Sequence, residues 1–266
     1  MGVRVCAALD AADGLELVAA VDPQHGGERL GTVVAGLSPS AAALGIASGI
    51  EVLATSRAEV AVDFTVADAA RSNLAWCAEH AIHAVCGTTG LGPDDLATLA
   101  EAFGPDRPAN ALVAANFSMG AVLMMRCAEL CAPFFEGIEI IELHHGHKKD
   151  APSGTSLVTA ERIEEGRRRR GAGPLAADPT ERQVLAGTRG GMLASGVHIH
   201  SVRLPGLVAH QEVILGAAGE TLSIRHDSND PVSFMPGVLL AVRRIAALDG
   251  LTVGLEPLLG IGESRE

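Results

Sequence analysis

The sequence predicts an α/β protein in which a Rossmann-like parallel sheet domain is joined to a second, α+β domain. Between residues 16 and 115, short apolar runs alternate with helical patterns, as in a doubly wound parallel sheet. Between residues 197 and 226, three extended runs follow one another with no helix between them. The 266 residues are enough for two cores. We therefore expect one domain at residues 1–117 and 229–266, and a second at 118–228.

In the first half, each expected strand is a short buried run followed by a helical pattern. Residues 16–22 combine apolar, partly β-branched positions with a terminal acid, and residues 60–64 repeat this pattern. Pro93 and the two acids after it suit the start of a helix at residues 93–103. The expected strands are 16–22, 60–64, 82–86 and 111–115, and the expected helices are 68–81 and 93–103.

In the second half, the helical patterns are longer and the strands follow one another. We expect helices at 119–135 and 156–169, and strands at 138–143, 197–204, 207–216 and 220–226. Asn229 is the expected cap of a last helix, 231–248, that returns to the first domain. The run 167–170 of four arginines is typical of a solvated helix end. The Gly/Pro-rich loop 171–196 is long for a compact domain.

Composition excludes several classes of function. The net charge of −12 argues against nucleic-acid binding, which requires a basic surface. No run approaches about 20 uninterrupted apolar residues, and no signal peptide is recognisable, so we expect a soluble protein without a membrane segment. The five scattered cysteines lack the paired spacing of a zinc site or a disulfide framework. A reducing cytoplasm fits this pattern.

Residues 142–155 concentrate chemically active side chains. Three His, two Lys, two acids and a Ser-Gly-Thr turn fall within these fourteen residues, directly after an expected strand. Such a connection is where open α/β folds present reactive groups. The turn Ser153-Gly154-Thr155 opens a helix and offers backbone N–H groups and a hydroxyl, and Lys148 adds a cation. The segment therefore predicts an anion site with acid/base groups.

Two other interpretations of the segment remain open. Imidazoles are common metal ligands, although the adjacent lysines would repel a cation and no cysteine or repeated spacing supports a site. The histidines could also make ordinary structural hydrogen bonds. We predict no metal.

The first domain gives weaker signals of a bound nucleotide. The turn Gly87-Thr-Thr-Gly90 follows a strand and could approach a nucleotide or nicotinamide closely, but it is equally compatible with an ordinary turn. Asp22, at a strand end, could bind ribose hydroxyls or simply end the strand.

Five motifs occur in the order found in one enzyme family. They are Val62-Asp-Phe-Thr65, Gly87-Thr-Thr-Gly90, Ala115-Asn-Phe-Ser118, the segment 142–155 and Gly206-Leu-Val-Ala-His-Gln-Glu212. With them, nearly the whole chain resembles the dihydrodipicolinate reductases, also called 4-hydroxy-tetrahydrodipicolinate reductases. The His-His-x-His-Lys…Ser-Gly-Thr pattern is the most specific part of the resemblance.

The resemblance implies an NADH- or NADPH-dependent enzyme of lysine and diaminopimelate biosynthesis. It reduces 4-hydroxy-tetrahydrodipicolinate, a cyclic dicarboxylate, to tetrahydrodipicolinate. The first domain binds the cofactor, and the second binds the substrate and assembles a homotetramer. His144 is the implied acid/base residue and Lys148 the implied proton donor. The implied substrate ligands are His145, Ser153, Gly154 and Thr155, and the implied cofactor contacts are Asp22, Phe64, Thr65, Gly87, Thr88, Thr89, Ala114, Ala115, Asn116 and Phe117.

The chain departs from the family pattern at its start. The family begins with a strand and a G-x-x-G-x-M-G turn, and Met1-Gly2 aligns with the last two residues of that turn. The resemblance thus implies that residues 3–12 form the first helix of the family fold. Without the first strand, its two neighbours would stand about 10 Å apart with unpaired backbone groups, and the pyrophosphate would lose its turn. We expect weak cofactor binding and reduced stability, and we hypothesise a true start upstream. An in-frame stop just before Met1 would refute this hypothesis.

Two alternative functions and one open question follow. If the short form is genuine, a non-catalytic relic or binding subunit that keeps the dicarboxylate pocket is the rival. An aspartate-type amino-acid dehydrogenase is the alternative among enzymes, although the Ser-Gly-Thr cradle speaks against it. Asp22 favours a free ribose hydroxyl and hence NADH, but the loop that would decide the cofactor is missing.

Overall fold

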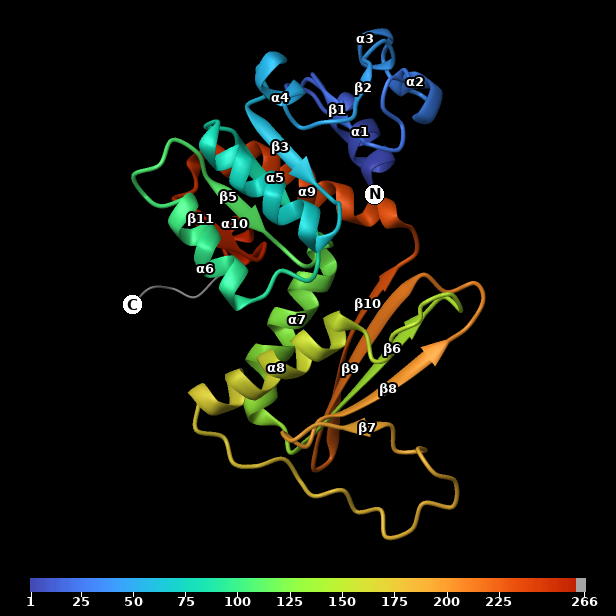
Figure 1. Ribbon diagram of the computed structural model, residues 1–266. Helices are drawn as coiled ribbons and strands as arrows, with labels where there is room; N and C mark the ends of the chain where they lie inside the picture. The colour runs from blue at the N-terminus through green and yellow to red at the C-terminus, as the bar shows by residue number, and fades with distance from the viewer. Residues whose placement is uncertain (262–266) are drawn as a thin grey trace. The chain divides into compact units, whose positions relative to one another are not determined.

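The computed structural model describes residues 1–261 and shows a chain divided into two compact units. The first unit comprises residues 1–119 together with the segment from Phe234 onward, and the second comprises Gly120–Ser233. Figure 1 shows both units, coloured from blue at the N-terminus to red at the C-terminus. Residues 262–266, the end of the first expected domain, lie outside the described part. Within residues 1–261, no helix is both long and apolar enough to traverse a bilayer.

The main sheet of the first unit is parallel, in the order β11-β5-β4-β3. Helices α5 and α6 lie on one face and α9 on the other (Figure 1). Its core includes Leu74, Cys86 and Phe103. The strands expected at 60–64, 82–86 and 111–115 are confirmed, whereas β11 was not predicted. The bounds are β3 Val60–Asp63, α5 Ala67–Glu79, β4 His83–Cys86, α6 Pro93–Ala102, β5 Ala111–Val113, α9 Met235–Arg244, β11 Leu251–Val253 and α10 Glu256–Leu259.

The expected strand at 16–22 is largely wrong. Only β1, Ala20–Val21, forms, and it pairs in parallel with β2, Ile46–Ala47, in a separate two-stranded sheet. A strand is held by its ladder partners, and among residues 1–261 no strand bonds to both β1 and β3. Val21 is accordingly 40% exposed. Short helices complete this region: α1 Gly2–Asp10, α2 Leu30–Val33, α3 Pro39–Ala42 and α4 Val52–Thr55.

The second unit is a five-stranded mixed sheet with two long helices, in the order β10-β9-β6-β8-β7. The pair β6 and β8 is parallel, and the other neighbours are antiparallel. All strands and helices expected here are confirmed, and β7 is an addition within the long loop. The bounds are α7 Met119–Cys131, η1 Ala132–Phe134, β6 Gly137–His144, α8 Gly154–Arg169, β7 Gly191–Met192, β8 His198–Arg203, β9 Ala209–Ala217 and β10 Glu220–Ser228.

Along β6, the sheet face that carries Ile138 and Ile140 changes from apolar to polar. Side chains two apart on a strand share a face, so this face continues with Glu142 and His144. The apolar residues pack with Ile163 of α8 in one core, and the polar residues come last, at the carboxyl end of the strand. The rows across the sheet are Leu215–Ile138, Val213–Ile140–Ile199, Gln211–Glu142–Ser201 and Ala209–His144–Arg203.

The last predicted helix, 231–248, forms in three pieces. These are η2 Pro231–Phe234, α9 Met235–Arg244 and η3 Ile245–Ala247. Pro236 lacks an N–H group and sits in the first turn of α9, which favours a new start there. The expected cap at Asn229 is wrong, because Asp230 instead accepts the backbone N–H of Val232 at 2.7 Å.

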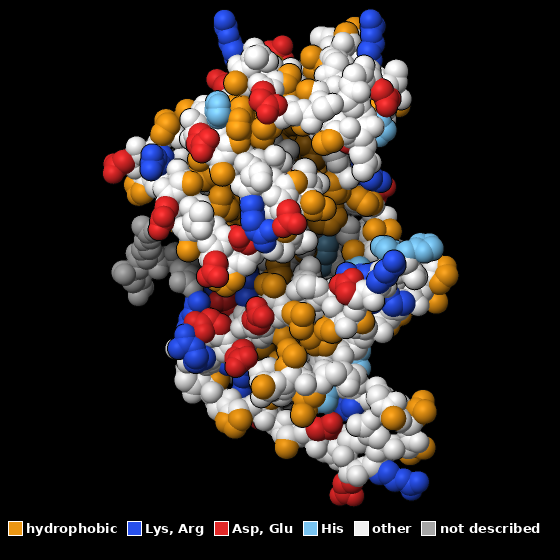
Figure 2. Space-filling model, in the orientation of Figure 1, with side chains coloured by type: hydrophobic (Ala, Val, Ile, Leu, Met, Phe, Trp, Pro, Cys, Tyr) orange, Lys and Arg blue, Asp and Glu red, His pale blue; other side chains and the backbone are white. Residues whose placement is uncertain are grey.

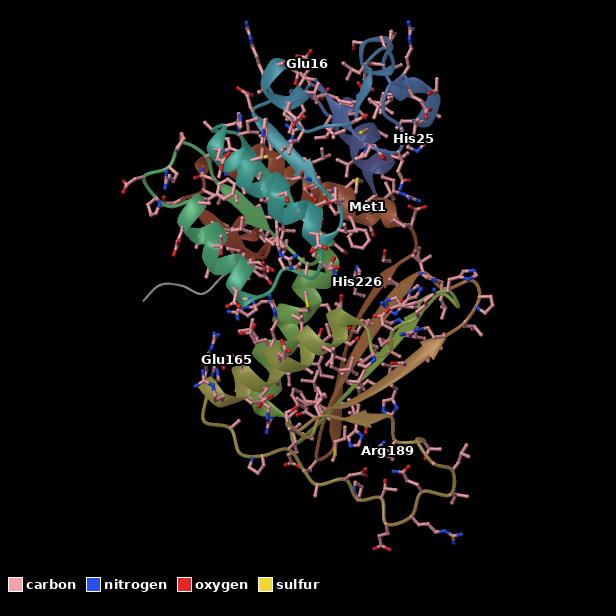
Figure 3. The ribbon with its side chains drawn as sticks, in the orientation of Figure 1. Met1, Glu16, His25, Glu165, Arg189 and His226 are labelled. Atoms are coloured by element: carbon pink, nitrogen blue, oxygen red, sulfur yellow. The ribbon has the colours of Figure 1, made fainter. Side chains whose placement is uncertain are left out.

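The arginine run at the end of α8 is only partly solvated. Arg168 and Arg169 bind Glu165 on the exposed end of the helix (Figure 3). Arg167 is 9% exposed and donates to the backbone carbonyls of Ala132, Phe135 and Gly173 at 2.6–2.7 Å. The prediction of a solvated end is therefore wrong for Arg167, which ties the end of η1 to α8.

We expect Gly166→Ala to destabilise the second unit by about 1–3 kcal/mol, the cost of overpacking a filled interior. A Cβ at Gly166 of α8 would lie 2.4 Å from the carbonyl oxygen of Glu129 in α7, and this backbone atom cannot move alone. The higher helix propensity of Ala offsets about 1 kcal/mol at most. Denaturant unfolding monitored by circular dichroism measures the loss.

Gly154→Ala is the matched control, because a Cβ at Gly154 in the same helix meets no atom within 4 Å. It should be at least as stable as the wild type. Equal stability of the two variants would contradict the close contact between α7 and α8.

Candidate functional site

The connection between β6 and α8 carries the predicted catalytic groups. His144 is the last residue of β6, and Ser153 is the N-cap of α8, and we call residues 144–153 the connection. Figure 2 shows His and Lys or Arg side chains gathered over this connection, with an acidic side chain beside them. The prediction of a reactive loop after a strand therefore has a defined place in the second unit.

His144 contacts a buried carboxylate. Its Nδ1 lies 2.5 Å from Oε2 of Glu142, whose side chain is completely buried. The guanidinium of Arg203 donates to both oxygens of Glu142 at 2.8 Å and to the backbone carbonyl of Asp150 at 2.6 Å. One arginine thus links the carboxylate next to His144 with the far end of the connection.

Burial and charge act on this pair in opposite directions. Burial raises the pKa of Glu142, but hydrogen bonds from Arg203, Ser201 and His144 outweigh it and hold that pKa below its usual range. For His144, burial is the largest effect and lowers the pKa. Glu142 raises it, and the cations Lys148 and Arg203 lower it further, so the net pKa of His144 is below its usual range. At neutral pH the ring is uncharged.

Lys148 is held by a neighbouring acid. Its Nζ donates to the two carboxylate oxygens of Asp150 at 2.9 and 2.8 Å, and its side chain is 21% exposed. His145 and His147 are exposed, and the Nδ1 of His145 accepts the backbone N–H of His147 at 3.2 Å. Across residues 1–261, no three His, Cys, Asp or Glu side chains come together in a metal-binding arrangement.

The predicted Ser-Gly-Thr cradle is the first turn of α8. The Oγ of Ser153 accepts the N–H of Ser156 at 3.3 Å, a side-chain cap. Ser156 donates to Oε1 of Gln211, and Nε2 of Gln211 donates to Thr159, at 2.8 and 2.7 Å. This buried network fixes the start of α8 on β9. The first N–H groups of a helix have no partner within it, so the turn offers an anchored anion site at Gly154 and Thr155.

In the first unit, Asp63 joins two of the predicted cofactor loops. At the end of β3, its Oδ1 accepts the N–H and hydroxyl of Thr65 at 2.9 and 2.8 Å and the hydroxyl of Thr88 at 2.8 Å. Its Oδ2 accepts Nδ2 of Asn73 at 2.7 Å. The loops after β3 and β4 are therefore tied together at the carboxyl edge of the sheet.

Gly87 has no room for a side chain. A Cβ there would lie 2.1 Å from the ring of Phe64, whose centroid is 5.5 Å from that of Phe117. The loops after β3, β4 and β5 thus meet beside Gly87, which is half-buried. This arrangement fits a flat nicotinamide ring at the carboxyl edge of a parallel sheet.

The other predicted cofactor residues differ in placement. Ala114 is buried and its N–H donates to Cys86 at 3.0 Å, Asn116 accepts the N–H of Ser118 at 2.8 Å, and Ala115 and Thr89 are exposed. Asp22 is exposed beyond β1, in the other sheet, and accepts the N–H of Gln24 at 2.8 Å. Strand pairing therefore does not join Asp22 to the loops after β3, β4 and β5.

A hollow of about 850 Å³ lies at the opposite edge of the first unit. Leu15, Val60, His83 and Arg243 line it, and Val60 is the first residue of β3. It is thus at the amino end of the parallel strands and contains no predicted site residue. Open parallel sheets bind ligands at the carboxyl ends, so we place the candidate site there.

Sequence reasoning assigned no role to four residues that organise these sites: Glu142, Arg203, Gln211 and Asp63. Glu142 stands two positions before His144, and this spacing on a strand is a signal of a shared face. Gln211 and Asp63 lie within quoted motifs. Arg203 gave no local signal, because its place beside His144 depends on the register of β8.

Comparisons with known proteins cover nearly the whole chain. Models described as dihydrodipicolinate reductase, N-terminus, and dihydrodipicolinate reductase, C-terminus, match residues 1–117 and 120–259. The 4-hydroxy-tetrahydrodipicolinate reductase of Cutibacterium acnes is 49% identical over 261 residues, 98% of this chain and 95% of that protein. The same-named protein of Nocardia farcinica is 48% identical over 264 residues, with the same coverage.

Solved structures give the same result. A dipicolinate-bound dihydrodipicolinate reductase from a Paenisporosarcina species has a TM-score of 0.80 and 33% identity, covering 97% of this chain and 95% of that one. An amine dehydrogenase from Mycobacterium smegmatis, with a TM-score of 0.62 and 14% identity, shares the fold alone. The chain therefore belongs to the dihydrodipicolinate reductase family.

Proposed function

We propose that this chain catalyses the NADH- or NADPH-dependent reduction of 4-hydroxy-tetrahydrodipicolinate to tetrahydrodipicolinate in lysine and diaminopimelate biosynthesis. One observation carries the proposal: residues 144–153 supply an imidazole at His144, an ammonium at Lys148 and a capped helix start at Ser153. The names of the relatives and the dipicolinate bound to one solved relative support it.

The second unit binds the dicarboxylate and supplies the proton that its ring takes up. The hydroxyl of Ser153, the N–H groups of Gly154 and Thr155 and the ring of His145 bind one carboxylate at the positive end of α8. Lys148 exchanges Asp150 for a substrate carboxylate and serves as proton donor. Loss of water precedes or accompanies reduction.

The nicotinamide supplies the hydride when bound. Hydride addition to a conjugated imine leaves negative charge on the ring, which must be protonated. Lys148 delivers this proton, and His144 exchanges protons at its Nε2 as the acid/base residue. The nearby ammonium also lowers the energy of the developing anion.

The first unit binds the nicotinamide cofactor at the carboxyl edge of its sheet. Phe64, Gly87 and Phe117 would hold the nicotinamide. Asp22 binds ribose hydroxyls, which favours NADH over NADPH because a 2′-phosphate would meet its carboxylate. The remaining contacts are Thr65, Thr88, Thr89, Ala114, Ala115 and Asn116.

The second unit also serves assembly, and we propose a homotetramer. The sheet face away from α8 carries the half-buried apolar side chains of Leu143 and Val202, which are partners in the register, and of Ile141, two residues before Leu143 on the same strand. A second copy would bury them. We also propose a cytoplasmic location, and the free cysteines support it because thiols stay reduced there.

A turnover assay tests the proposal. The purified protein is incubated with 4-hydroxy-tetrahydrodipicolinate and NADH or NADPH, and separately with the substrates of an aspartate dehydrogenase. We expect cofactor oxidation with the cyclic dicarboxylate alone. Turnover confined to aspartate would overturn the proposal.

Calorimetric titration separates the enzyme from a non-catalytic relic. An enzyme binds both dipicolinate and a reduced nicotinamide cofactor. A relic binds dipicolinate and neither NADH nor NADPH, and this result would also contradict the proposal.

A further inference from the structure

We propose that Glu142 is a positioning residue for His144: its buried carboxylate fixes the ring proton on Nδ1 and leaves Nε2 as the nitrogen that exchanges protons, while Arg203 fixes the carboxylate. The inference rests on the proposed role of His144, but the contacts that carry it are independent of any substrate.

The strand itself brings the two side chains together. Glu142 and His144 are two residues apart on β6 and share the face toward α8. An ionised carboxylate only accepts hydrogen bonds, so at 2.5 Å the Nδ1 of His144 must donate to it. An uncharged ring has one donor and one acceptor nitrogen. Nε2 therefore carries the lone pair.

Arg203 keeps Glu142 ionised although the carboxylate is fully buried. Burying an unpaired charge is very unfavourable. Glu142 is paired, because the guanidinium of Arg203 donates to both of its carboxylate oxygens at 2.8 Å. Such bidentate pairing also fixes the plane of the carboxylate. The register places Arg203 directly beside His144, on the neighbouring strand β8.

The charges around His144 then set its protonation. Glu142 faces it from β6, Arg203 from β8 and Lys148 from the connection, and its partner on β9 is the uncharged Ala209. One anion against two cations, together with burial, keeps the ring neutral at neutral pH. A neutral ring with a fixed proton can accept a proton at Nε2 and return it.

The same arginine orients the connection. Its bond to the carbonyl of Asp150 at 2.6 Å holds the residue whose side chain binds Lys148. Glu142 and Arg203 therefore fix the imidazole directly and the ammonium through Asp150. This explains why a buried carboxylate paired with an arginine occupies the polar end of an otherwise apolar sheet face.

The chain contains a matched control three residues earlier on the same strand. Glu139 also binds one arginine and one histidine: Arg189 donates to it at 2.6 Å, and Nε2 of His200 lies 2.8 Å away. Arg189 comes from the long loop before β7 (Figure 3). Glu139 lies on the other face of the sheet, so Glu139→Gln removes the same charge from β6 without touching His144.

The test is a ¹⁵N NMR titration of His144 in the free protein, with His144→Gln used to assign its signals. We expect the Nδ1–H form in the wild type. In Glu142→Gln the amide can donate to Nδ1, so the Nε2–H form should gain population, and the ring should titrate at a lower pH because an attractive anion is lost. In the same variant kcat should fall about tenfold or more with KM little changed. Glu139→Gln should change none of these.

A wild-type ring in the Nε2–H form would overturn the inference, as would a folded Glu142→Gln whose tautomer and titration match the wild type. If Glu142→Gln does not fold, Glu142→Asp keeps the charge and the arginine pair but withdraws the carboxylate from the ring. The Nδ1–H population should then fall, and an unchanged population would refute the proposal. Because the titration needs no substrate, a failure of the proposed reaction would be seen separately.

Discussion

Replacing His144 with Gln is expected to lower kcat by about 10²- to 10⁴-fold, the usual contribution of a general acid/base group, with little change in KM. An amide cannot exchange a proton near neutral pH, so the variant loses the proton transfer that stabilises the transition state. The Arg203 pair keeps Glu142 satisfied without the ring, and substrate binding should persist. Steady-state kinetics over a range of substrate concentrations gives both constants.

His147→Gln is the control for this variant. His147 lies on the same connection but is exposed, and it has no assigned role. Its kcat and KM should match the wild type. An effect of His144→Gln confined to KM would contradict a role in proton exchange and would leave His144 as a binding residue.

Replacing Lys148 with Ala is expected to damage both constants, by about tenfold or more each. A hydrogen bond to a charged group contributes about 1.5–3 kcal/mol, so loss of a carboxylate partner raises KM. Loss of the proton donor lowers kcat. Kinetics measures both effects, and calorimetry with dipicolinate isolates the binding part.

Lys149→Ala removes the same charge from the next, exposed position. Exposed charges are well screened by solvent, so this variant should retain nearly full activity. If Lys148→Ala behaved like Lys149→Ala, Lys148 would act only through the general field of the connection, and the assignment as proton donor would be wrong.

The sequence predicted most elements because each carries its own periodicity. The rows of β6 and the apolar face of α8 are local patterns, and they appear at the expected residues. The run 16–22 has the same local pattern but forms only Ala20–Val21. Strands depend on partners distant in sequence, and within residues 1–261 this run pairs with β2 alone.

Single side chains were less predictable than elements. Four consecutive arginines look alike in a sequence, yet Arg167 is buried against backbone carbonyls while its neighbours bind Glu165. Which arginine at the end of α8 is buried depends on the positions of η1 and Gly173, which are set by the tertiary structure. The three-residue strand β11 was missed because so short a run has no measurable period.

The candidate site in the second unit was predictable because its groups are contiguous. His144, Lys148 and Ser153 lie within one connection, so their proximity follows from the chain itself, whatever the fold around them. The sequence by itself therefore determined which chemistry is present: imidazole, ammonium and a helix start for an anion.

Tertiary structure alone decided how these groups are held. Arg203 reaches Glu142 because β8 pairs in parallel with β6, and Gln211 reaches Ser156 because β9 pairs on the other side. A shift of one residue in either register would turn these side chains to the opposite face. Local sequence specifies the reactive groups, but the pairing of distant strands specifies their orientation and charge.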